Sequence, residues 1–472
     1  MAPSSGLDTS FRTALGRLDR ARRLQKVTKP VSPEYEVAGL MKAYDGGNAL
    51  LFESVDGYEW PVIGNLFGSP ENCQVCFDTD VEGLRHLMSG AIHRPLPPKQ
   101  VDSEIAAQQV VHDEQIDLAS LLPVLTHSLS DAGRFITAGV VLARNPETGV
   151  NNASFHRLQL LGGNRTGIKL DYGRHLRSAF ESAQAKGTDL ELAVCLGTDI
   201  ALTFAAAFMG SQMPESADEI AASGGIRNAP LEVAPCLTNS LFVPAQTEIV
   251  LEGRISCTNT CDEGPFAEFL GYLSGESEAP VFMVDAVTHR HEPIYHAING
   301  FGRETIMLRK YVLEASVLQA LKESIPSVVD VELTAGGLHR FHLVVQVAKR
   351  SPRDDGYERN AIMAAIACLK DLDQVVVVDD DIDIRDVNEV EYAIATRVEA
   401  ARDIVLIPGA RGHEYIRVSR SGIRTKVGID ATVPHSERAL FRRAEFLPGE
   451  LCEDAWTTEP GPLSSTGSEE DR

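Results

Sequence analysis

Short hydrophobic runs rich in β-branched residues recur through the middle of the chain, from about residue 121 to residue 310. Gly, Asn and Pro turn signals separate these runs, a pattern that is typical of strands joined by short loops. We expect strands over 135–143, 192–198, 248–256 and 281–289. The segment 172–186 has helical spacing instead and is followed by Gly187, a residue type that commonly ends helices. The pattern predicts a β-rich central domain.

After residue 310 the pattern changes, because helical and strand-like segments alternate. We expect helices over 312–324, 359–369 and 387–400, and strands over 327–333, 342–348 and 375–378. The last of these strands is an unbroken run of Val, as in a parallel strand that is buried on both faces. Alternation of this kind predicts an α/β layer structure.

These patterns divide the chain into three domains and a tail. Residues 1–120 mix helices with short strands over 49–52 and 61–66, and we expect an N-terminal α/β domain there. The β-rich domain covers 121–310, the C-terminal α/β domain covers 311–455, and the polar residues 456–472 are expected to be disordered. The expected fold class is therefore α+β and multidomain, in line with roughly 150 residues per domain.

Charge and composition narrow the choice of partners. The 472 residues include 44 Lys and Arg against 67 Asp and Glu, which gives a net charge of −23. Nucleic acid and anionic membrane surfaces repel such a chain, so we expect neither as a partner. The chain has no apolar run of membrane-spanning length, and its basic N-terminus lacks the apolar core of a secretory signal. We expect an N-terminal helix rather than a transit peptide, and a cytoplasmic protein with reduced cysteines.

Two cysteine pairs raise the question of a metal or redox site. Cys73 and Cys76 form a CxxC motif, and Cys257 and Cys261 form a CxxxC motif. The pairs belong to different expected domains, whereas a structural zinc site needs four converging ligands. The first pair also lacks the strand-to-helix context of a thioredoxin-like motif. We interpret these cysteines as isolated small hydrophobic residues.

A run of polar residues at 151–159 (NNASFHRLQ) lies inside the β-rich domain. Buried polar groups need hydrogen-bond partners, so such a run is typical of a pocket lining. A solvated edge strand that ends in the Gly162-Gly163 turn would show the same pattern. The run alone does not decide between these two interpretations.

Two acids and three histidines are further candidates for chemistry. Glu263 and Glu268 flank Gly264-Pro265, which breaks the strand and can bring both carboxylates into one place. Adjacent acids need an arginine between them, or one of them takes a raised pKa and can donate a proton. An exposed acidic loop and a glycoside hydrolase carboxylate pair are the alternatives. His289, His291 and His296 are candidate metal ligands or pocket residues.

Taken in order, these segments resemble the UbiD family of reversible decarboxylases. The resemblance covers roughly residues 40–440. It rests on segments in a fixed order: 51–53 (LFE), 61–68 (PVIGNLFG), 131–140 (DAGRFITAGV), 219–227 (EIAASGGIR), 243–253 (VPAQTEIVLEG), 263–268 (EGPFAE) with Gly271 and Tyr272, 377–379 (VVD), 407–411 (IPGAR) and 425–430 (TKVGID). Asn228 stands where the family often has Gly.

The resemblance implies a fold and a cofactor. An N-terminal α/β region is followed by a split β-barrel that binds a flavin and by a C-terminal α/β domain that mediates dimer contacts. The active site is implied between the barrel and the C-terminal domain, where closure would exclude water. The family uses prenylated FMN as an electron sink, together with Mn²⁺ or Mg²⁺ and K⁺. A flavin prenyltransferase is implied as the supplier of the cofactor, and a homodimer or higher homo-oligomer as the assembly.

The resemblance also implies roles for individual residues. Asn152, His175 and Glu219 match the ligands of the divalent ion, and a hard cation suits oxygen donors with one imidazole. Arg157, Glu263 and Glu268 match the catalytic network, in which Arg157 binds the substrate carboxylate, Glu263 holds Arg157, and Glu268 donates the proton. Further cofactor contacts are expected from residues of the polar run and from one lysine that matches a phosphate contact, namely Ser154, Phe155, His156, Gln159 and Lys426.

The expected reaction is the reversible, non-oxidative decarboxylation of an aromatic or heteroaromatic acid. His289, His291, His296 and Phe301 are predicted to line the substrate pocket. A histidine-rich wall favours a heteroaromatic acid such as an indole, pyrrole or furan carboxylate. Within the family, an α,β-unsaturated, phenolic or polycyclic acid is the alternative. Outside it, a flavin-free two-carboxylate hydrolase and a non-catalytic flavin-binding protein stay open.

Overall fold

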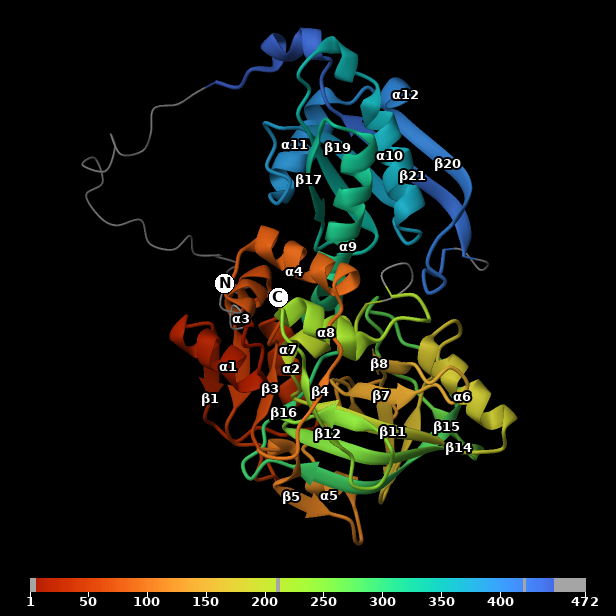
Figure 1. Cartoon of the computed structure of the whole chain (residues 1–472). Helices are drawn as coiled ribbons and strands as arrows, with labels where there is room; N and C mark the ends of the chain where they lie inside the picture. The colour runs from red at the N-terminus through yellow and green to blue at the C-terminus, as the bar shows by residue number, and fades with distance from the viewer. Residues whose placement is uncertain (1–5, 209–212, 419–421, 445–472) are drawn as a thin grey trace, which may run out of the picture.

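The computed structural model describes residues 6–208, 213–418 and 422–444. Helices and strands are mixed, and the C-terminal α/β domain forms one end of the molecule, where the long helix α9 links it to the rest (Figure 1). The expected α+β, multidomain fold class is confirmed. The expected disordered tail at 456–472 lies outside the described residues.

A four-stranded sheet, in the order β1-β2-β3-β16, organises the N-terminal part. Its strands are β1 (Leu24–Val27), β2 (Ala49–Phe52), β3 (Val62–Gly64) and β16 (Tyr295–His296). The accompanying helices are α1 (Phe11–Arg20), α2 (Glu36–Ala43), α3 (Pro70–Phe77) and α4 (Val81–His93). The expected N-terminal helix is present, and α1 begins where the Ser10 side chain accepts a hydrogen bond from the Thr13 N–H.

A nine-stranded sheet forms the central part. Its main order is β6-β9-β10-β15-β14-β11-β7-β8, and β5 pairs with β15. The strands are β5 (Val110–His112), β6 (Phe135–Ile136), β7 (Val140–Arg144), β8 (Asn151–Phe155), β9 (Leu158–Gly162), β10 (Arg165–Ile168), β11 (Leu190–Leu196), β14 (Ile249–Glu263) and β15 (Ser277–His289). β14 and β15 are the longest pair, and they carry the polypeptide from His289 at one end to Glu263 at the other.

Two central elements differ from the sequence prediction. The expected strand at 135–143 is divided into β6 and β7, because β6 pairs with β9 whereas β7 pairs with β11. Gly139 lies at the division, where a Cβ atom would come within 2.5 Å of the Val194 side chain. The expected helix at 172–186 begins later, as α6 (His175–Ala185), since Gly173 has a φ of +70° that a helix excludes.

Short elements surround the central sheet. They are α5 (Leu118–Leu121), α7 (Ile200–Ala205), α8 (Glu219–Arg227) and a three-stranded sheet of β4 (Lys99–Gln100), β12 (Glu232–Pro235) and β13 (Phe242–Pro244). The Asp218 side chain caps the start of α8 by accepting from Ile220 N–H and Ala221 N–H. Asn228 ends α8 with a φ of +54°, a left-handed conformation that Asn adopts more readily than most residues. This explains how Asn stands at a position where the family often has Gly.

The C-terminal domain is a five-stranded sheet with helices, in the order β17-β18-β19-β21-β20. Its strands are β17 (Val328–Leu333), β18 (His342–Val347), β19 (Gln374–Asp379), β20 (Ile404–Arg411) and β21 (Ile423–Ala431). Its helices are α9 (Arg303–Ser324), α10 (Tyr357–Cys368), α11 (Val387–Arg397) and α12 (Ala400–Asp403). The Val run is the buried strand β19, which pairs in parallel with β18 and β21 as expected.

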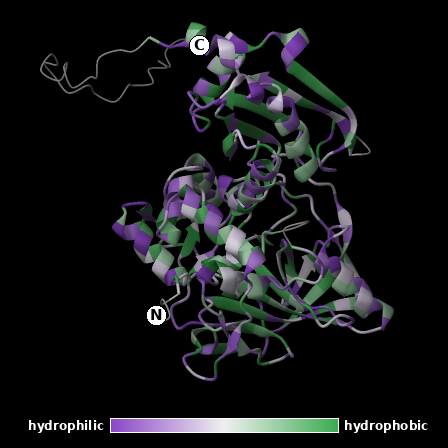
Figure 2. Cartoon of the chain, turned by 45° about the horizontal axis from the view of Figure 1, so that its top comes forward, coloured by the Kyte–Doolittle hydropathy of each residue, from purple (hydrophilic) through white to green (hydrophobic). Residues whose placement is uncertain are grey.

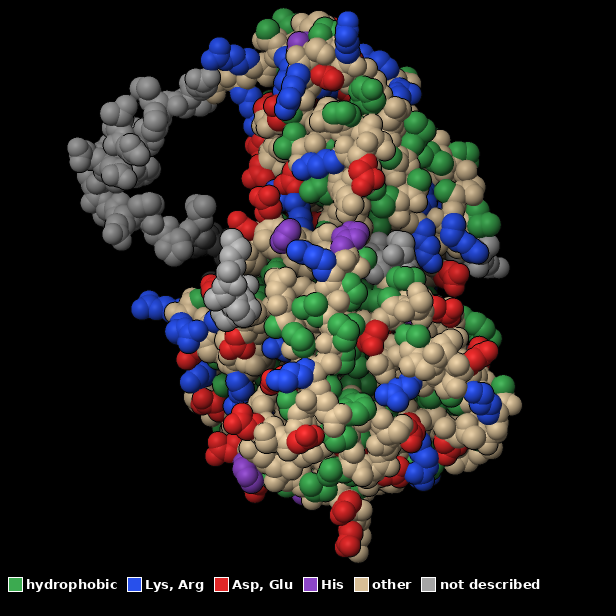
Figure 3. All heavy atoms as spheres, viewed as in Figure 1, with side chains coloured by type: hydrophobic (Ala, Val, Ile, Leu, Met, Phe, Trp, Pro, Cys, Tyr) green, Lys and Arg blue, Asp and Glu red, His purple; other side chains and the backbone are tan. Residues whose placement is uncertain are grey.

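Hydrophobic residues follow the strands of the C-terminal sheet, while the surrounding helices and loops alternate between polar and apolar residues (Figure 2). On the face shown in Figure 3, acidic and basic side chains are interspersed. Within the described residues, no helix combines the length and the apolar character needed to cross a membrane.

Candidate active site

Arg157 and Glu263 form a two-point ion pair at the edge of the central sheet. Arg157 lies in the two-residue link between β8 and β9, and Glu263 is the last residue of β14. Arg157 Nε donates to Glu263 Oε1 at 2.6 Å, and the second guanidinium nitrogen, Nη2, donates to Oε2 at 2.8 Å. The side chains are 9% and 0% exposed, respectively. Two parallel bonds of this kind fix the plane of the guanidinium.

Glu268 contacts the remaining side of the same guanidinium. Arg157 Nη1 donates to Glu268 Oε1, so Arg157 lies between two carboxylates. The Glu268 side chain is 23% exposed, in contrast to the fully buried Glu263. Burial raises the pKa of Glu268 above its ordinary value, although the charges of Arg157 and Lys169 oppose the shift. A carboxyl with a raised pKa and partial exposure is suited to proton transfer.

The loop that carries Glu268 is held by backbone and side-chain contacts. Glu268 N–H donates to the Tyr272 carbonyl at 3.0 Å, and Ala267 N–H donates to Asp131 Oδ1 at 3.0 Å. Gln159 Oε1 accepts from Gly264 N–H at 2.9 Å, which places Gln159 behind the acid pair. Ser274 Oγ accepts from Arg157 Nη2 at 3.1 Å. These contacts set the position of the guanidinium and of both acids.

Asn152, His175 and Glu219 come together from three separate elements. Asn152 lies on β8, while His175 and Glu219 are the first residues of α6 and α8. His175 Nδ1 lies 3.6 Å from Glu219 Oε1, and Glu219 Oε2 accepts from Ala153 N–H at 3.0 Å. Asn152 Nδ2 donates to Ser154 Oγ at 2.9 Å. One imidazole and two oxygen donors fit Mn²⁺ or Mg²⁺.

Ser154 and His156 connect the two groups. His156 Nε2 lies 3.1 Å from Ser154 Oγ, which also accepts from Asn152 Nδ2. His156 Nδ1 lies 2.8 Å from the Lys169 carbonyl. Burial lowers the pKa of His156, which favours the neutral imidazole. Phe155 is half-buried beside this chain of contacts.

The structure does not bring all predicted pocket residues to this place. His289 pairs with Ile249, at the opposite end of the β14–β15 ladder from Glu263 and its partner Ser277. His289 contacts His112 at 3.1 Å and packs on Trp60, and His291 lies two residues farther along the chain. The strand between the ends spans about 40 Å at 3.3 Å per residue. His289 and His291 therefore lie far from Arg157 and Glu268.

The remaining two pocket candidates differ from each other. His296 is buried in β16, where Nε2 lies 2.9 Å from Glu304 Oε1 and the ring packs near Phe67. The Glu304 carboxylate is thus a hydrogen-bond partner of the His296 imidazole. Phe301 instead lies against Gly271 in the Glu268 loop, since a Cβ atom on Gly271 would come within 2.9 Å of its ring. Of the predicted pocket residues, Phe301 is the one that contacts the Glu268 loop.

Lys426 lies inside the C-terminal domain. It is a buried residue of β21, and its ammonium donates to the Lys370 carbonyl at 2.6 Å. Burial lowers the pKa of Lys426, although nearby Asp373 opposes the shift. The structure places Lys426 in contact with its own domain and not with Asn152, His175 or Glu219.

The cysteines behave as small hydrophobic residues. Cys73 and Cys76 are buried in α3, where burial raises their pKa values and disfavours the reactive thiolate. All seven cysteines in the described part of the chain are free, and the same residues contain no cluster of three or more His, Cys, Asp or Glu arranged to hold a metal. Asn152, His175 and Glu219 fall outside that description, because only two of the three are of these residue types and the third is an amide.

Several residues at the site were not predicted from the sequence. Asp131, which accepts from Ala267 N–H in the Glu268 loop, lies in the family segment 131–140, and this position could have indicated that it belongs to the site. The Tyr415 hydroxyl donates to Asp171 Oδ1 at 2.6 Å across the domains. This pair carried no sequence signal, because 244 positions separate the two residues. Phe269, next to Glu268, also packs on Phe341 and His413 of the C-terminal domain. The Glu268 loop is thus in direct contact with that domain.

A surface pocket lies near the Asn-His-Glu set but does not include it. Asn151 and Ile220, the sequence neighbours of Asn152 and Glu219, contribute to its lining. The other lining residues belong to the surrounding strands and loops: Pro98, Gln100, Leu142, Ala143, Val233, Leu241 and Phe242. Asn152, His175 and Glu219 are therefore not part of the lining of this surface pocket.

Comparisons with known proteins give one consistent result. Three family models match in order: the 3-octaprenyl-4-hydroxybenzoate carboxy-lyase N-terminal domain over residues 15–89, the Rift-related domain of the same carboxy-lyase over 99–302, and its C-terminal domain over 306–431. An anhydromevalonate phosphate decarboxylase from Methanosarcina mazei is 36% identical over 442 residues, which are 93% of this chain and all of the relative.

Solved structures agree with the sequence comparisons. The UbiD-class enzyme HmfF from Pelotomaculum thermopropionicum, solved in complex with FMN, superposes with a TM-score of 0.88 at 38% identity, covering 93% of this chain and 97% of that one. The apo 3,4-dihydroxybenzoic acid decarboxylase from Klebsiella pneumoniae superposes with a TM-score of 0.88 at 27% identity, covering 95% and 100%. With all three family domains matched in sequence and the whole fold matched in structure, the chain belongs to the UbiD family of carboxy-lyases.

Proposed function

We propose that this protein is a prenylated-FMN-dependent decarboxylase of an aromatic, heteroaromatic or α,β-unsaturated carboxylic acid, and that the reaction reverses at high CO₂. The observation that carries the proposal is the position of Arg157 between Glu263 and Glu268. One carboxylate fixes the arginine, and the other is partly exposed with a raised pKa. The two acids therefore have different environments, which supports different roles.

The contacts suggest how the chain's own residues would act. Glu263 holds Nε and Nη2 of Arg157, so the substrate carboxylate would bind the side of the guanidinium that Glu268 now occupies. When the carbon–carbon bond breaks, CO₂ leaves and the electron pair stays on the substrate carbon. Glu268 would then give its proton to that carbon and recover a proton from solvent. In the reverse direction Glu268 would accept the proton.

The cofactor proposal rests on the donor set beside this network. Bound prenylated FMN would supply the electron sink for the carbon that loses CO₂. Asn152, His175 and Glu219 would hold Mn²⁺ or Mg²⁺ next to the cofactor phosphate, with K⁺ nearby. Ser154, Phe155 and His156 would line the cofactor, while Gln159 would position the acid loop. Lys426 stays a proposed phosphate contact, because the bond to the Lys370 carbonyl uses one of the three donors of its ammonium.

The structure gives less reason than the sequence did to prefer a heteroaromatic substrate. The heteroaromatic preference depended on a histidine-rich wall, and His289 and His291 lie at the far end of the β14–β15 ladder. Relatives are named as decarboxylases of gallate, a phenolic acid, and of anhydromevalonate phosphate, a phosphate ester. Aromatic, heteroaromatic and unsaturated acids therefore all belong in a first substrate panel.

We also propose a homodimer or higher homo-oligomer and a flavin prenyltransferase as the supplier of the cofactor. The edge strand β20 exposes Ile404 and Leu406, which are 38% and 65% exposed. Apolar side chains on a long edge strand support contact with a second copy. Light scattering of the full chain tests this proposal, and a monomer at micromolar concentration would contradict it.

The decisive experiment is co-expression with a flavin prenyltransferase, followed by measurement of CO₂ release from the acid panel. Active protein should lose turnover by about 10²–10⁴-fold in Glu268→Gln, since a positioned proton donor contributes this much. Glu276 is an exposed acid two residues after Ser274, so Glu276→Gln is the matched control and should keep full turnover. Full turnover in Glu268→Gln would contradict the assigned proton donor.

Absorbance separates this proposal from its two rivals. A flavoenzyme absorbs in the near-ultraviolet and visible range, whereas a flavin-free hydrolase is colourless. In His175→Ala and Glu219→Ala the bound flavin should fall, because the proposed divalent ion loses a ligand. Stoichiometric flavin in both variants would contradict the metal assignment. Flavin binding without turnover of any acid would favour the non-catalytic flavin-binding protein.

A further inference from the structure

The Glu268 loop, residues 268–273, contains a tight turn. Glu268 N–H donates to the Tyr272 carbonyl at 3.0 Å, which brings the two ends of the loop together. Phe269 lies at the start of the loop, and Tyr272 and Leu273 lie at its end. In so short a loop, a contact at either end changes the direction of the Glu268 side chain.

One short segment of the C-terminal domain contacts both ends of this loop. It is the segment 413–417 (HEYIR), in the connection between β20 and β21. This connection lies at the end of the C-terminal domain that points toward the central part of the molecule (Figure 1). Three alternate residues of the segment make the contacts, namely His413, Tyr415 and Arg417.

Phe269, at the start of the loop, lies among aromatic rings of the C-terminal domain. Its ring centroid is 5.7 Å from that of His413, and 6.4 Å from those of Phe341 and Tyr415. His413 and Tyr415 also lie against each other, with centroids 5.2 Å apart. Burial lowers the pKa of His413, so its ring is neutral and packs as an aromatic group. Rings separated by about 4.5–7 Å attract one another, so this group holds Phe269 in place.

Arg417 holds the other end of the loop. Its Nη2 donates to the Leu273 carbonyl at 2.5 Å, and its guanidinium lies over the Tyr272 ring at 5.2 Å. The carbonyl of Tyr272 is the group that accepts from Glu268 N–H. Arg417 is exposed, so it acts on the loop from the surface and not from the hydrophobic core.

Tyr415 connects the same segment to the sheet that carries Arg157. Its hydroxyl donates to Asp171 Oδ1 at 2.6 Å, and Asp171 lies three residues after the end of β10. Ile168, the last residue of β10, pairs with Leu158, which follows Arg157 in the chain. The segment therefore contacts both the loop of the acid and the part of the sheet that carries the arginine.

The charged groups around Glu268 act in both directions. Burial raises the pKa of Glu268, the charges of Arg157 and Lys169 lower it, and the charge of Asp171 raises it. Burial and Asp171 raise the pKa of Tyr415, so the phenol keeps its proton and stays a hydrogen-bond donor. Since burial is the largest of the causes that act on Glu268, a loop that opened to water would lose much of the shift.

We propose that the segment 413–417 positions the proton donor: it holds both ends of the loop and so keeps the Glu268 carboxyl directed at the carbon that loses CO₂. This inference rests on the proposed decarboxylase function and adds residues of the C-terminal domain to it. The three side chains act through the loop and transfer no proton themselves. The proton still passes from Glu268 to the substrate carbon.

The first test follows the protonation of Glu268 without turnover. pH-difference infrared spectra of the flavin-loaded protein, with Glu268→Gln as the blank, give the midpoint at which this carboxyl loses its proton. Arg417→Ala frees one end of the loop and admits water, so the midpoint should fall toward the ordinary range of a glutamate. Glu414 belongs to the same segment and its side chain is 73% exposed, so Glu414→Gln is the matched control and should keep the wild-type midpoint.

The second test is kinetic and uses an acid that the wild type decarboxylates. In Arg417→Ala, kcat should fall about 10- to 100-fold, because a misplaced donor costs this much. KM should change less than about twofold, because the substrate carboxylate still binds Arg157. The solvent deuterium isotope effect on kcat should rise, since proton transfer becomes slow relative to loss of CO₂. Arg417→Lys keeps a donor and a positive charge and should recover part of the loss.

Tyr415→Phe is a second, smaller change in the same segment. It removes the hydroxyl that donates to Asp171 and keeps the ring against Phe269. kcat should fall about 3- to 10-fold, again with a larger isotope effect and a nearly constant KM.

Three results would overturn the inference. The first is full kcat in both Arg417→Ala and Tyr415→Phe. The second is a lower kcat with an unchanged Glu268 midpoint and an unchanged isotope effect, because the segment would then only stabilise the fold. The third is a higher KM at constant kcat, because the segment would then bind the substrate.

These outcomes are separable from those that test the decarboxylase proposal. If the wild type decarboxylates no acid, the proposed function fails, and the infrared midpoints still decide whether the segment 413–417 positions Glu268. If the wild type is active and the variants match it in rate and midpoint, the inference fails and the reaction stands.

Discussion

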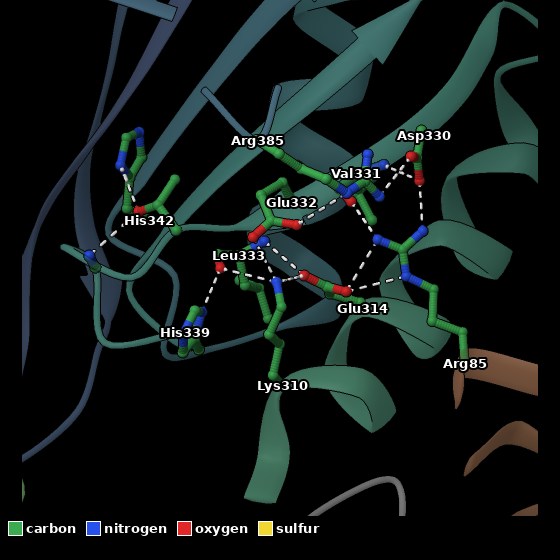
Figure 4. Close-up of polar contacts among 12 residues, drawn as sticks. Arg85, Lys310, Glu314, Asp330, Val331, Glu332, Leu333, His339, His342 and Arg385 are labelled. Carbon is green, nitrogen blue, oxygen red and sulfur yellow. Dashed lines mark hydrogen bonds and ion pairs between the residues drawn. The ribbon is translucent and has the colours of Figure 1, made fainter. Parts of the chain in front are cut away.

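Two regions of this protein place an arginine between carboxylates, and they serve different purposes. At the candidate active site Arg157 lies between Glu263 and Glu268. At the junction of α4, α9 and β17, Arg85 donates to Glu314 at 3.0 Å and to Asp330 at 2.5 Å (Figure 4). The sequence contains a motif around the first cluster, whereas Arg85 and Asp330 of the second are 245 positions apart.

Charge balance separates the two clusters. The Arg85 cluster includes Lys310 and Arg385, so three basic groups face the acids Glu314, Asp330 and Glu332. The site cluster has one arginine for two acids. Each cluster contains a carboxyl with a raised pKa, Glu268 at the site and Glu332 in the other cluster. A raised pKa alone therefore does not identify a catalytic acid. What distinguishes Glu268 is that its cluster has more acids than basic groups and that its carboxyl is partly exposed.

The largest effect should come from Arg157→Ala. The substrate carboxylate loses its partner, so turnover should fall by about 10³–10⁴-fold in steady-state assays. Thermal unfolding of the flavin-loaded protein is the control. If the variant lost activity only because less of it was folded, the Arg157 cluster would have a structural role like that of the Arg85 cluster.

Arg85→Ala should act in the opposite way. Removing this guanidinium leaves the buried Glu314 with one fewer partner, which costs about 3–5 kcal/mol of unfolding free energy. Denaturant unfolding measures the loss, and turnover per folded molecule should stay near the wild-type value. A variant as stable as the wild type would show that the cluster does not hold α4 to α9.

Glu332→Gln should change the pH dependence of stability. Burial and nearby Glu314 raise the pKa of Glu332 to about 7. The folded state then binds a proton that the unfolded state has released, so wild-type stability should fall as pH rises from about 4.5 to 7, by at most about 3 kcal/mol. The glutamine variant should lack this part of the slope in unfolding curves collected across that range. An identical slope in both proteins would assign the proton to another group.

Ser274→Ala should have the smallest effect. The hydroxyl accepts from Arg157 Nη2, and its loss should cost about 1 kcal/mol, or roughly fivefold in kcat/KM. Stability should change little, because Glu263 still holds the guanidinium by two bonds. A loss as large as that of Arg157→Ala would mean that Ser274 itself takes part in the reaction.

Local patterns in the sequence predicted the class of fold and singled out Glu263 and Glu268, while the family resemblance implied that Arg157 lies with them. Short hydrophobic runs predicted the strands now seen as β2, β11 and β19, and the motif at 263–268 indicated the acid pair. The division of 135–143 into two strands could not be predicted, since pairing partners decide it.

Residues brought together by long-range packing were beyond local reasoning. His289 and His291 have the spacing of a ligand pair, yet the direction of β15 carries them away from Glu263. Tyr415 has no local signal, because the placement of the C-terminal domain brings its hydroxyl to Asp171. Lys426 matched a motif, while the direction of its side chain depends on the Lys370 carbonyl.

Consecutive residues on α9 have a consequence for how such an enzyme changes during evolution. Arg309 and Lys310 leave the helix about 100° apart, so one turns toward the domain junction and the other toward the buried cluster of Arg85. Substitution at position 309 thus changes the contact with the Ala207 carbonyl at the domain junction, while the neighbouring residue keeps the helix in place. Selection can therefore act on the fit between the domains and on the stability of the buried cluster through separate residues of one helix turn.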